Sequence, residues 1–301
     1  MIPHILEVAE SGRYISKQHG AIIIKDGTGP GGMVTLDDIG IMIVSAYGAT
    51  LTKEALVSLA ERGAVTVLCG TNCLPAALVV PTTANYEMPL RVRLQVGATL
   101  PLKKRLWQAL VQAKLVHQGR VLESIGKNQE AHRIFRLSTE VQSGDPQNKE
   151  ATGARVYWKN LFGETFHRSK DGTWPNGALN YGYTILRSAT ARAIYGAGLL
   201  PLFSIHHENS TNTLPLADDL MEPYRPIVDY IVYNVAKEEQ NLTSNAKQLI
   251  SKLIWADLTY KESTTPLHKA LEQLCYSLVQ SFNEKKCVLE IPEIRVFHEL
   301  S

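Results

Sequence analysis

The chain has 301 residues, of which 45% are hydrophobic and 20% are charged. This length predicts about two domains, and the composition is that of a folded globular protein, which excludes a disordered chain and a coiled coil. With 31 basic and 29 acidic side chains, the formal net charge is +2, so total charge alone indicates no particular partner.

Neither export nor membrane insertion is expected. The first residues, MIPHILEVAESGRY, include acids and a proline where a secretory signal needs a basic end and an unbroken apolar core. The sequence has no run of about 18 apolar residues, the length that spans a bilayer. Its four cysteines are too few for a disulfide scaffold. We therefore expect a cytoplasmic protein without membrane association.

Residues 1–85 are predicted to form a small N-terminal β-rich domain. Short runs rich in β-branched residues, separated by turn residues, are typical of strands. One helix is expected among them, from Thr52 as the N-cap to Gly63 as the C-terminal stop. Because no internal repeat is visible, the pattern indicates a packed sheet or a sandwich. Strands are expected at 21–24, 33–36, 39–44, 65–68 and 77–80.

The composition changes after this region. Proline and small polar residues at 81–89 are typical of a linker, which we place at 86–100. Residues 101–301 are predicted to form a larger all-α domain, because apolar residues recur there at helical intervals. The predicted fold is thus α+β with two domains, a sandwich-like β domain followed by a helical one. Helices are expected from Pro101 onward and at 121–140, 147–162, 177–197, 215–238, 243–256 and 265–283.

Basic side chains are concentrated between residues 91 and 136. This segment holds ten lysines and arginines and only Glu123 and Glu130 as acids, a net charge of +8. A basic helical face attracts a polyanion such as double-stranded DNA, because each neutralised phosphate releases counterions. An ordinary solvated helix surface is the competing interpretation. The residues that we assign to DNA binding are Lys103, Lys104, Arg105, Arg133 and Arg136.

Glu150 is the first of three polar positions for which neighbouring residues predict burial. In KEATGARVYWKNLFG it shares one helical stripe with Ala154, Tyr157 and Leu161. A carboxylate on an inward face needs a partner or a cation. The alternative is an acid that the helix dipole favours near a helix N-terminus.

The other two positions are a histidine pair and a crowded acidic segment. His206 and His207 follow an apolar run, and in an extended segment they would point to opposite sides. Each could also be an ordinary core or surface histidine. In LADDLMEPYRP, Asp219 and Glu222 are helical neighbours at i, i+3. Such acids repel unless they are solvated, paired with Arg225 or share a cation, and a polar helix end is the alternative.

Together these positions supply two carboxylates and an imidazole, a donor set suited to a divalent metal ion. Oxygen ligands favour Mg²⁺ or Mn²⁺, and the imidazole shifts the preference slightly towards Mn²⁺. A metal ion beside a basic surface indicates phosphodiester chemistry, because the cation offsets charge on the reacting phosphate.

At these residues the chain resembles the CRISPR-associated integrases of spacer acquisition, the larger of the two core adaptation proteins, in the form found in type II systems. The resemblance covers nearly the whole chain, and the order and spacing of its motifs agree. By motif position it implies Glu150, His207 and Glu222 as catalytic metal ligands, with Asp219 in a supporting role. The family histidine lies three residues after a position that is usually glycine, where this chain has Ser204. The motifs are NKEATGARVYWKNLFG (148–163), NGALNYGYTILRSATARAI (176–194), SIHHEN (204–209) and LADDLMEPYRPIVDYIV (216–232).

The resemblance also implies an assembly and a reaction. It implies a homodimer held largely through the β-rich half, and a complex in which two such dimers flank a dimer of the small second adaptation protein. Captured duplex DNA would lie across this heterohexamer, and its 3′ hydroxyls would attack the ends of a CRISPR repeat with Mg²⁺ or Mn²⁺ bound. A type II effector nuclease and an accessory protein are further candidate partners that the sequence leaves open. Two other functions remain as alternatives: a stand-alone branched-DNA nuclease and a non-catalytic DNA-binding scaffold.

Overall fold

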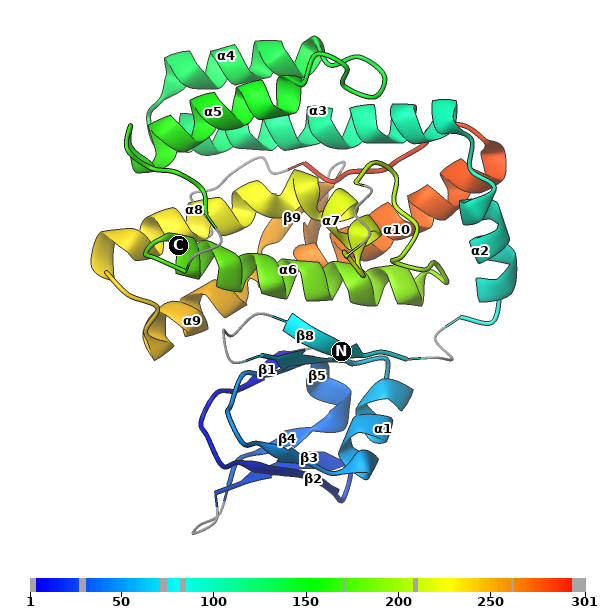
Figure 1. Ribbon diagram of the computed structural model, residues 1–301, viewed down its shortest axis with the longest axis vertical. Helices are drawn as coiled ribbons and strands as arrows, with labels where there is room; N and C mark the ends of the chain where they lie inside the picture. The colour runs from blue at the N-terminus through cyan, green and yellow to red at the C-terminus, as the bar shows by residue number, and fades with distance from the viewer. Residues whose placement is uncertain are drawn as a thin grey trace. The chain divides into compact units, whose positions relative to one another are not determined.

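The computed structural model describes residues 4–26, 31–70, 75–81, 85–169, 172–207, 211–260 and 263–293. The chain forms two compact units, residues 1–86 and residues 87–301 (Figure 1). The first unit is rich in strands and the second in helices, so the predicted order of the two fold classes is confirmed.

Within the described residues, the β-rich unit contains two four-stranded sheets. Both sheets mix parallel and antiparallel pairs. The strands of the first sheet, in spatial order, are β1 (His4–Val8), β5 (Ile39–Val44), β7 (Val65–Cys69) and β8 (Pro75–Val79). Those of the second sheet are β4 (Met33–Thr35), β3 (Ala21–Lys25), β2 (Tyr14–Gln18) and β6 (Thr50–Leu51).

Side chains from both sheets and from helix α1 (Lys53–Glu61) form a shared apolar core. All six residues of β5 are buried, as expected for a strand with a parallel neighbour on each side. Helix α1 begins as predicted, because the hydroxyl of Thr52 accepts a hydrogen bond from the backbone N–H of Ala55. Gly63, with a φ of 73°, follows its end. The sandwich-like prediction is therefore confirmed.

The helical unit consists of two packed groups of helices. In the first group α3, α4 and α5 pack on one another, and in the second α6 packs against α7, α8, α9 and α10. Figure 1 shows the first group stacked over the layer that contains α6, α8 and α10. The helices of the first group are α3 (Leu100–Ser124), α4 (Asn128–Thr139) and α5 (Lys149–Phe162). Those of the second are α6 (Asn176–Gly196), α7 (Pro215–Met221), α8 (Arg225–Glu238), α9 (Ser244–Ser251) and α10 (Leu267–Glu284).

Helix α6 is the core element of its group, because most of its residues are buried around the whole circumference. Its sequence is rich in alanine, glycine and small polar residues, which allow neighbouring helices to approach. In the described part of the chain, the helices are too short or too polar to cross a membrane.

The segment predicted to be a linker, residues 86–100, contains helix α2 (Met88–Val96). Gln95 is buried, and its side-chain amide donates hydrogen bonds to the carbonyl oxygens of Leu200 and Phe203, at 2.8 and 3.0 Å. Pro89 lies in the first helical turn, where its missing N–H costs nothing. The proline therefore marks the start of a packed helix and not a linker.

The second unit is also not entirely helical. The predicted helix at 243–256 ends as α9 at Ser251 and continues as a 3-10 turn, Lys252–Trp255. An antiparallel hairpin of β9 (Asp257–Tyr260) and β10 (Ser263–Pro266) follows and contacts α10. Threonines make this short segment suited to strands, but it is too brief for a clear alternating pattern.

Candidate active site

The predicted site residues Glu150, His207 and Glu222 come from separate segments that meet beside helix α3. Glu150 lies in the first turn of α5, and His207 lies in the loop after α6. Glu222 begins a 3-10 turn, Glu222–Tyr224, between α7 and α8. Helix α3 contacts α5, α7 and this turn, so it forms one wall of the site.

The start of α5 fixes the position of Glu150. The carboxylate of Asp145 accepts hydrogen bonds from the backbone N–H groups of Lys149 and Glu150, at 2.9 and 3.0 Å. These bonds satisfy donors that a helix N-terminus leaves without an internal partner. Farther along the same stripe, Tyr157 and Leu161 are buried, as the helical periodicity predicted. The stripe therefore points Glu150 towards α3.

Lys114 of α3 lies between the two predicted carboxylate ligands. Its Nζ is 2.5 Å from Oε1 of Glu150 and 2.6 Å from Oε2 of Glu222. The side chains of Lys114 and Glu222 are only 9% and 4% exposed, so these ion pairs are largely withdrawn from water. Burial alone would lower the pKa of Lys114, but the charges of Glu222 and Glu150 overcome this effect and raise it. The amine is therefore a cation.

Glu222 has another cationic neighbour in Arg225, whose Nε is 3.1 Å from Oε1 of Glu222. Burial would raise the pKa of Glu222, but the charges of Arg225 and Lys114 lower it below its usual value. The nearby Asp218 pairs instead with Arg187, at 2.7 Å. Glu222 and its neighbour Asp218 thus have separate cationic partners.

Asp219 organises the loop that carries the histidines, and its side chain is fully buried. Oδ2 accepts hydrogen bonds from the backbone N–H groups of Ile205 and His206, at 2.7 and 2.9 Å. Oδ1 accepts one from the backbone N–H of His207 at 3.2 Å and lies 2.6 Å from Nδ1 of the same residue. The loop therefore wraps around one carboxylate.

Trp107 of α3 contacts both histidine rings. It stacks on His206 with ring centroids 4.2 Å apart, and it meets His207 edge-on at 5.1 Å. The prediction that the two histidines point to opposite sides is wrong, because the segment bends around Asp219 and is not extended. His206 packs on the tryptophan face, whereas His207 is the histidine that a buried carboxylate holds.

The Asp219 contact also determines how His207 can act. In the neutral imidazole, Nδ1–H donates to the carboxylate, which leaves the lone pair of Nε2 to accept a ligand. The hydrogen bond to Asp219 raises the pKa of His207, and the charges of Asp219, Glu222 and Glu150 act in the same direction.

These residues suit a divalent cation, although they do not enclose one as they stand. Among the described residues, no three His, Cys, Asp or Glu side chains lie close enough together to hold a metal ion. Glu150 and Glu222 already share a cation in Lys114, and His207 has the carboxylate partner that metal-binding histidines commonly have. Two carboxylates and an imidazole are donor types that Mg²⁺ or Mn²⁺ accepts.

The basic segment divides into paired and accessible groups. Lys114 is buried in the site, Arg91 pairs with Glu87, and Arg120 pairs with Glu293 at 3.5 Å. These three cations already have acidic partners, so they are less available to DNA phosphates than the net charge of the segment suggests. The residues assigned to DNA binding keep access to solvent, with Lys103 partly exposed and the others exposed, namely Lys104, Arg105, Arg133 and Arg136.

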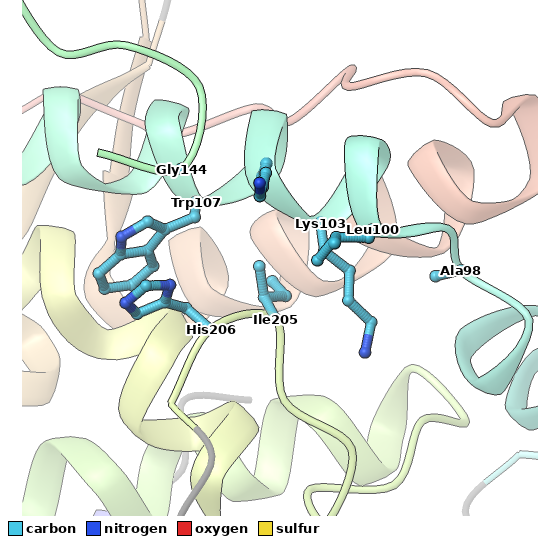
Figure 2. Close-up of a pocket in the computed structure, with 8 residues that line it drawn as sticks. Ala98, Leu100, Lys103, Trp107, Gly144, Ile205 and His206 are labelled. Carbon is cyan, nitrogen blue, oxygen red and sulfur yellow. The ribbon is translucent and has the colours of Figure 1, made fainter. Parts of the chain in front are cut away.

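A pocket of about 270 Å³ adjoins the histidine loop (Figure 2). Lys103, Lys104 and Trp107 of α3 line one side, and Ile205 and His206 line the other. Figure 2 shows the rings of Trp107 and His206 lying against each other at one end, with the Lys103 side chain extending at the other. The two lysines place positive charge beside the histidine loop, where an anionic ligand would be attracted.

Sequence reasoning missed the roles of Lys114 and Trp107. A signal existed for Lys114, because it follows Leu110 by four residues and so lies on the inward face of its helix. A lysine there needs a partner for the same reason that Glu150 does. No such signal existed for Trp107, since a tryptophan on an apolar face is ordinary core.

A family model and a relative of known family both match most of this chain. A family model described as CRISPR associated protein Cas1 matches residues 6–254. The CRISPR-associated endonuclease Cas1 of Neisseria meningitidis serogroup C (strain 8013) is 33% identical over 290 residues, covering 95% of this chain and 94% of that protein.

Solved structures with a similar fold include a casposase bound to integration product, with a TM-score of 0.79 and 19% identity over 95% of this chain and 92% of that one. A Cas1 protein from Thermotoga maritima has a TM-score of 0.75 and 14% identity, covering 97% of this chain and all 100% of the other. A chain of a Cas6-RT-Cas1–Cas2 complex has a TM-score of 0.75 and 18% identity over 98% of this chain and 37% of that one.

Proposed function

The chain belongs to the Cas1 family of CRISPR-associated endonucleases, and from this premise we propose that it is a metal-dependent integrase that inserts captured duplex DNA into a CRISPR repeat array. The observation that carries the proposal is that Glu150 and Glu222 share the cation of Lys114 beside α3, while Asp219 holds His207 in the loop that packs on Trp107 of the same helix. This site lies next to a pocket that contains two lysines.

Glu150, Glu222 and Nε2 of His207 would hold one Mg²⁺ or Mn²⁺. When bound, such an ion offsets the negative charge of the reacting phosphate and polarises it towards attack. Asp219 keeps the histidine loop folded and His207 in the tautomer that leaves Nε2 available. Accessible lysines and arginines of α3 and α4 would bind the DNA phosphates.

The reaction is a transesterification in which the nucleophile is the 3′ hydroxyl of the captured DNA. A new bond forms between this oxygen and a phosphorus at the end of a repeat, while the bond from that phosphorus to its original 3′ oxygen breaks. One phosphodiester is exchanged for another, so the step needs neither ATP nor a covalent protein intermediate. The protein's own residues position the DNA and the reacting phosphate.

We further propose the assembly that the family resemblance implies. The β-rich unit would hold two copies of this chain together, and two such dimers would flank a dimer of the small second adaptation protein. The likeness to a chain of a Cas1–Cas2 complex supports this proposal at the level of the fold.

The direct test compares Glu150→Ala with the unchanged protein, each mixed with the small partner, duplex DNA and a repeat-bearing plasmid. We expect the variant to bind DNA but to lose insertion at the repeat ends. Glu140→Ala is the matched control, because Glu140 pairs with Lys149 outside the site and should leave insertion unchanged.

The same experiment separates the alternative functions. Cleavage of branched DNA without insertion would indicate a stand-alone nuclease. If Glu150→Ala still inserts DNA, the Glu150 carboxylate is not needed for the reaction. DNA binding with no reaction in any mixture would indicate a scaffold.

A further inference from the structure

The starting observation is that the two glutamates of the site already share a cation supplied by the chain itself. Nζ of Lys114 is 2.5 Å from Glu150 and 2.6 Å from Glu222, and these are direct ion-pair distances. The lysine comes from α3, whereas its partners come from α5 and from the turn after α7. The contact is therefore tertiary and unites all three segments.

A divalent ion on the same oxygen atoms could not coexist with this ammonium. Carboxylate oxygens bind Mg²⁺ at about 2.0–2.1 Å, and the ammonium lies at hydrogen-bond distance from the same carboxylates. Two cations so placed would be a few Å apart in a poorly solvated site, where like charges repel strongly. Arg225 contacts Oε1 of Glu222, so it does not span the two carboxylates as Lys114 does.

We propose that Lys114 is a built-in counter-ion that competes with the divalent metal for Glu150 and Glu222 and must leave these carboxylates when the metal binds. The inference rests on the proposed function, because it concerns the same metal site. Lys114 is thus a residue that sets metal affinity and not a ligand.

The competition has a physical benefit for the metal-free protein. Without Lys114, the half-buried Glu150 would lose this ion pair and the buried Glu222 would keep only Arg225 as a cationic partner, so the fold would be less stable. With Lys114 between them, α3, α5 and the turn after α7 stay together before any metal arrives. The cost is weaker metal binding, because the ion must first break two ion pairs.

Removal of the lysine charge tests this inference. Lys114→Gln keeps a polar side chain without the charge, and Mn²⁺ binding to the full, DNA-free chain is measured by titration with electron paramagnetic resonance at pH 8. We expect the dissociation constant for Mn²⁺ to fall by about tenfold or more, because the bound ion no longer faces a competing charge. The metal-free variant should melt at a lower temperature than the unchanged protein, and Mn²⁺ should raise its melting temperature by more.

Lys149→Gln is the matched control. The Nζ of Lys149 is also 2.5 Å from a glutamate, Glu140, but this glutamate is not part of the site. Loss of the Lys149 charge should leave the Mn²⁺ dissociation constant unchanged. Glu150→Gln should abolish the binding, which locates the ion.

A second measurement uses the unchanged protein and so does not depend on whether a variant folds. Lysine acylation followed by mass spectrometry reports the access of reagent to Nζ. We expect saturating Mn²⁺ to increase the labelling of Lys114 severalfold while the labelling of Lys149 stays constant. Equal labelling of Lys114 with and without bound Mn²⁺ would overturn the inference.

The outcomes distinguish this inference from the proposed function. If Mn²⁺ binds through Glu150 and Lys114→Gln does not bind it more tightly, the counter-ion role is wrong while the metal site stands. If neither the unchanged protein nor Lys114→Gln binds Mn²⁺, the metal site itself is wrong and the competition falls with it.

Discussion

Replacement of Asp219 by asparagine tests whether one buried carboxylate holds the histidine loop. The change keeps the shape of the side chain but turns one of its two oxygens into an amide nitrogen, which cannot accept a hydrogen bond. Either the backbone N–H groups of Ile205 and His206 or the two contacts of His207 then lose their acceptor. The buried donors would face another donor.

The expected cost follows from these contacts. A lost hydrogen bond to a buried charged group costs about 1–3 kcal/mol, so two lost bonds predict about 2–6 kcal/mol less stability. Metal affinity should fall as well, because loss of the group that orients a metal-binding histidine typically weakens binding about 10–100-fold. Asp219→Asn should therefore lower both the free energy of unfolding and the affinity for Mn²⁺.

Urea denaturation measures the first effect and titration with Mn²⁺ the second. Asp218→Asn is the matched control, because Asp218 lies next in the same helix and pairs with Arg187 at 2.7 and 3.0 Å. This control should lose some stability but keep its metal affinity. An Asp219→Asn variant that binds Mn²⁺ within about twofold of the unchanged protein would refute the positioning role.

Three further predictions concern other parts of the helical unit. Burial raises the pKa of Asp229 to about 7, above the unfolded value of about 4. Between these two pH values the folded state holds a proton that the unfolded state has lost, so the stability that this group contributes decreases as the pH rises from about 4 to about 7. The free energy of unfolding of Asp229→Asn, measured by urea denaturation, should therefore rise by a few kcal/mol relative to that of the unchanged protein between pH 5 and pH 8. A difference in unfolding free energy between variant and unchanged protein that stays constant with pH would contradict this. The variant is compared with the unchanged protein because burial lowers the pKa of His117 to about 4, and this makes the folded state more stable as the pH rises. Gly119→Ala should destabilise the protein by about 1–3 kcal/mol in the same assay, since the added Cβ would lie 2.4 Å from the ring of Phe135, and an unchanged midpoint would show that the ring moves freely. Arg136→Gln should reduce the slope of log DNA affinity against log salt by about 0.9, and an identical slope would remove this residue from the DNA contact.

Local patterns predicted most of the secondary structure. The cap at Thr52, the strand at 39–44 and the stripe of Glu150, Tyr157 and Leu161 each depend on residues that are near in sequence, and all three are present. Helix α2 was missed because proline is common both in linkers and in the first turn of a helix, so Pro89 did not distinguish the two.

The site depends on contacts that a local pattern does not contain. The histidine loop is bent by Asp219, which lies 12 residues after His207 in a different element, so the local sequence suggested an extended segment. Lys114 meets Glu150 from 36 residues away. The sequence could show that each of these polar groups needs a partner, but the choice of partner is set by the packing of α3 against α5 and α7.

The most direct measurement is a crystal structure of the protein soaked in Mn²⁺, with anomalous diffraction recorded at the manganese edge. The account predicts a peak bound by carboxylate oxygens of Glu150 and Glu222 and by Nε2 of His207, with Nζ of Lys114 no longer between the two glutamates. A peak elsewhere, or both glutamates still paired with Lys114 at saturating Mn²⁺, would contradict it.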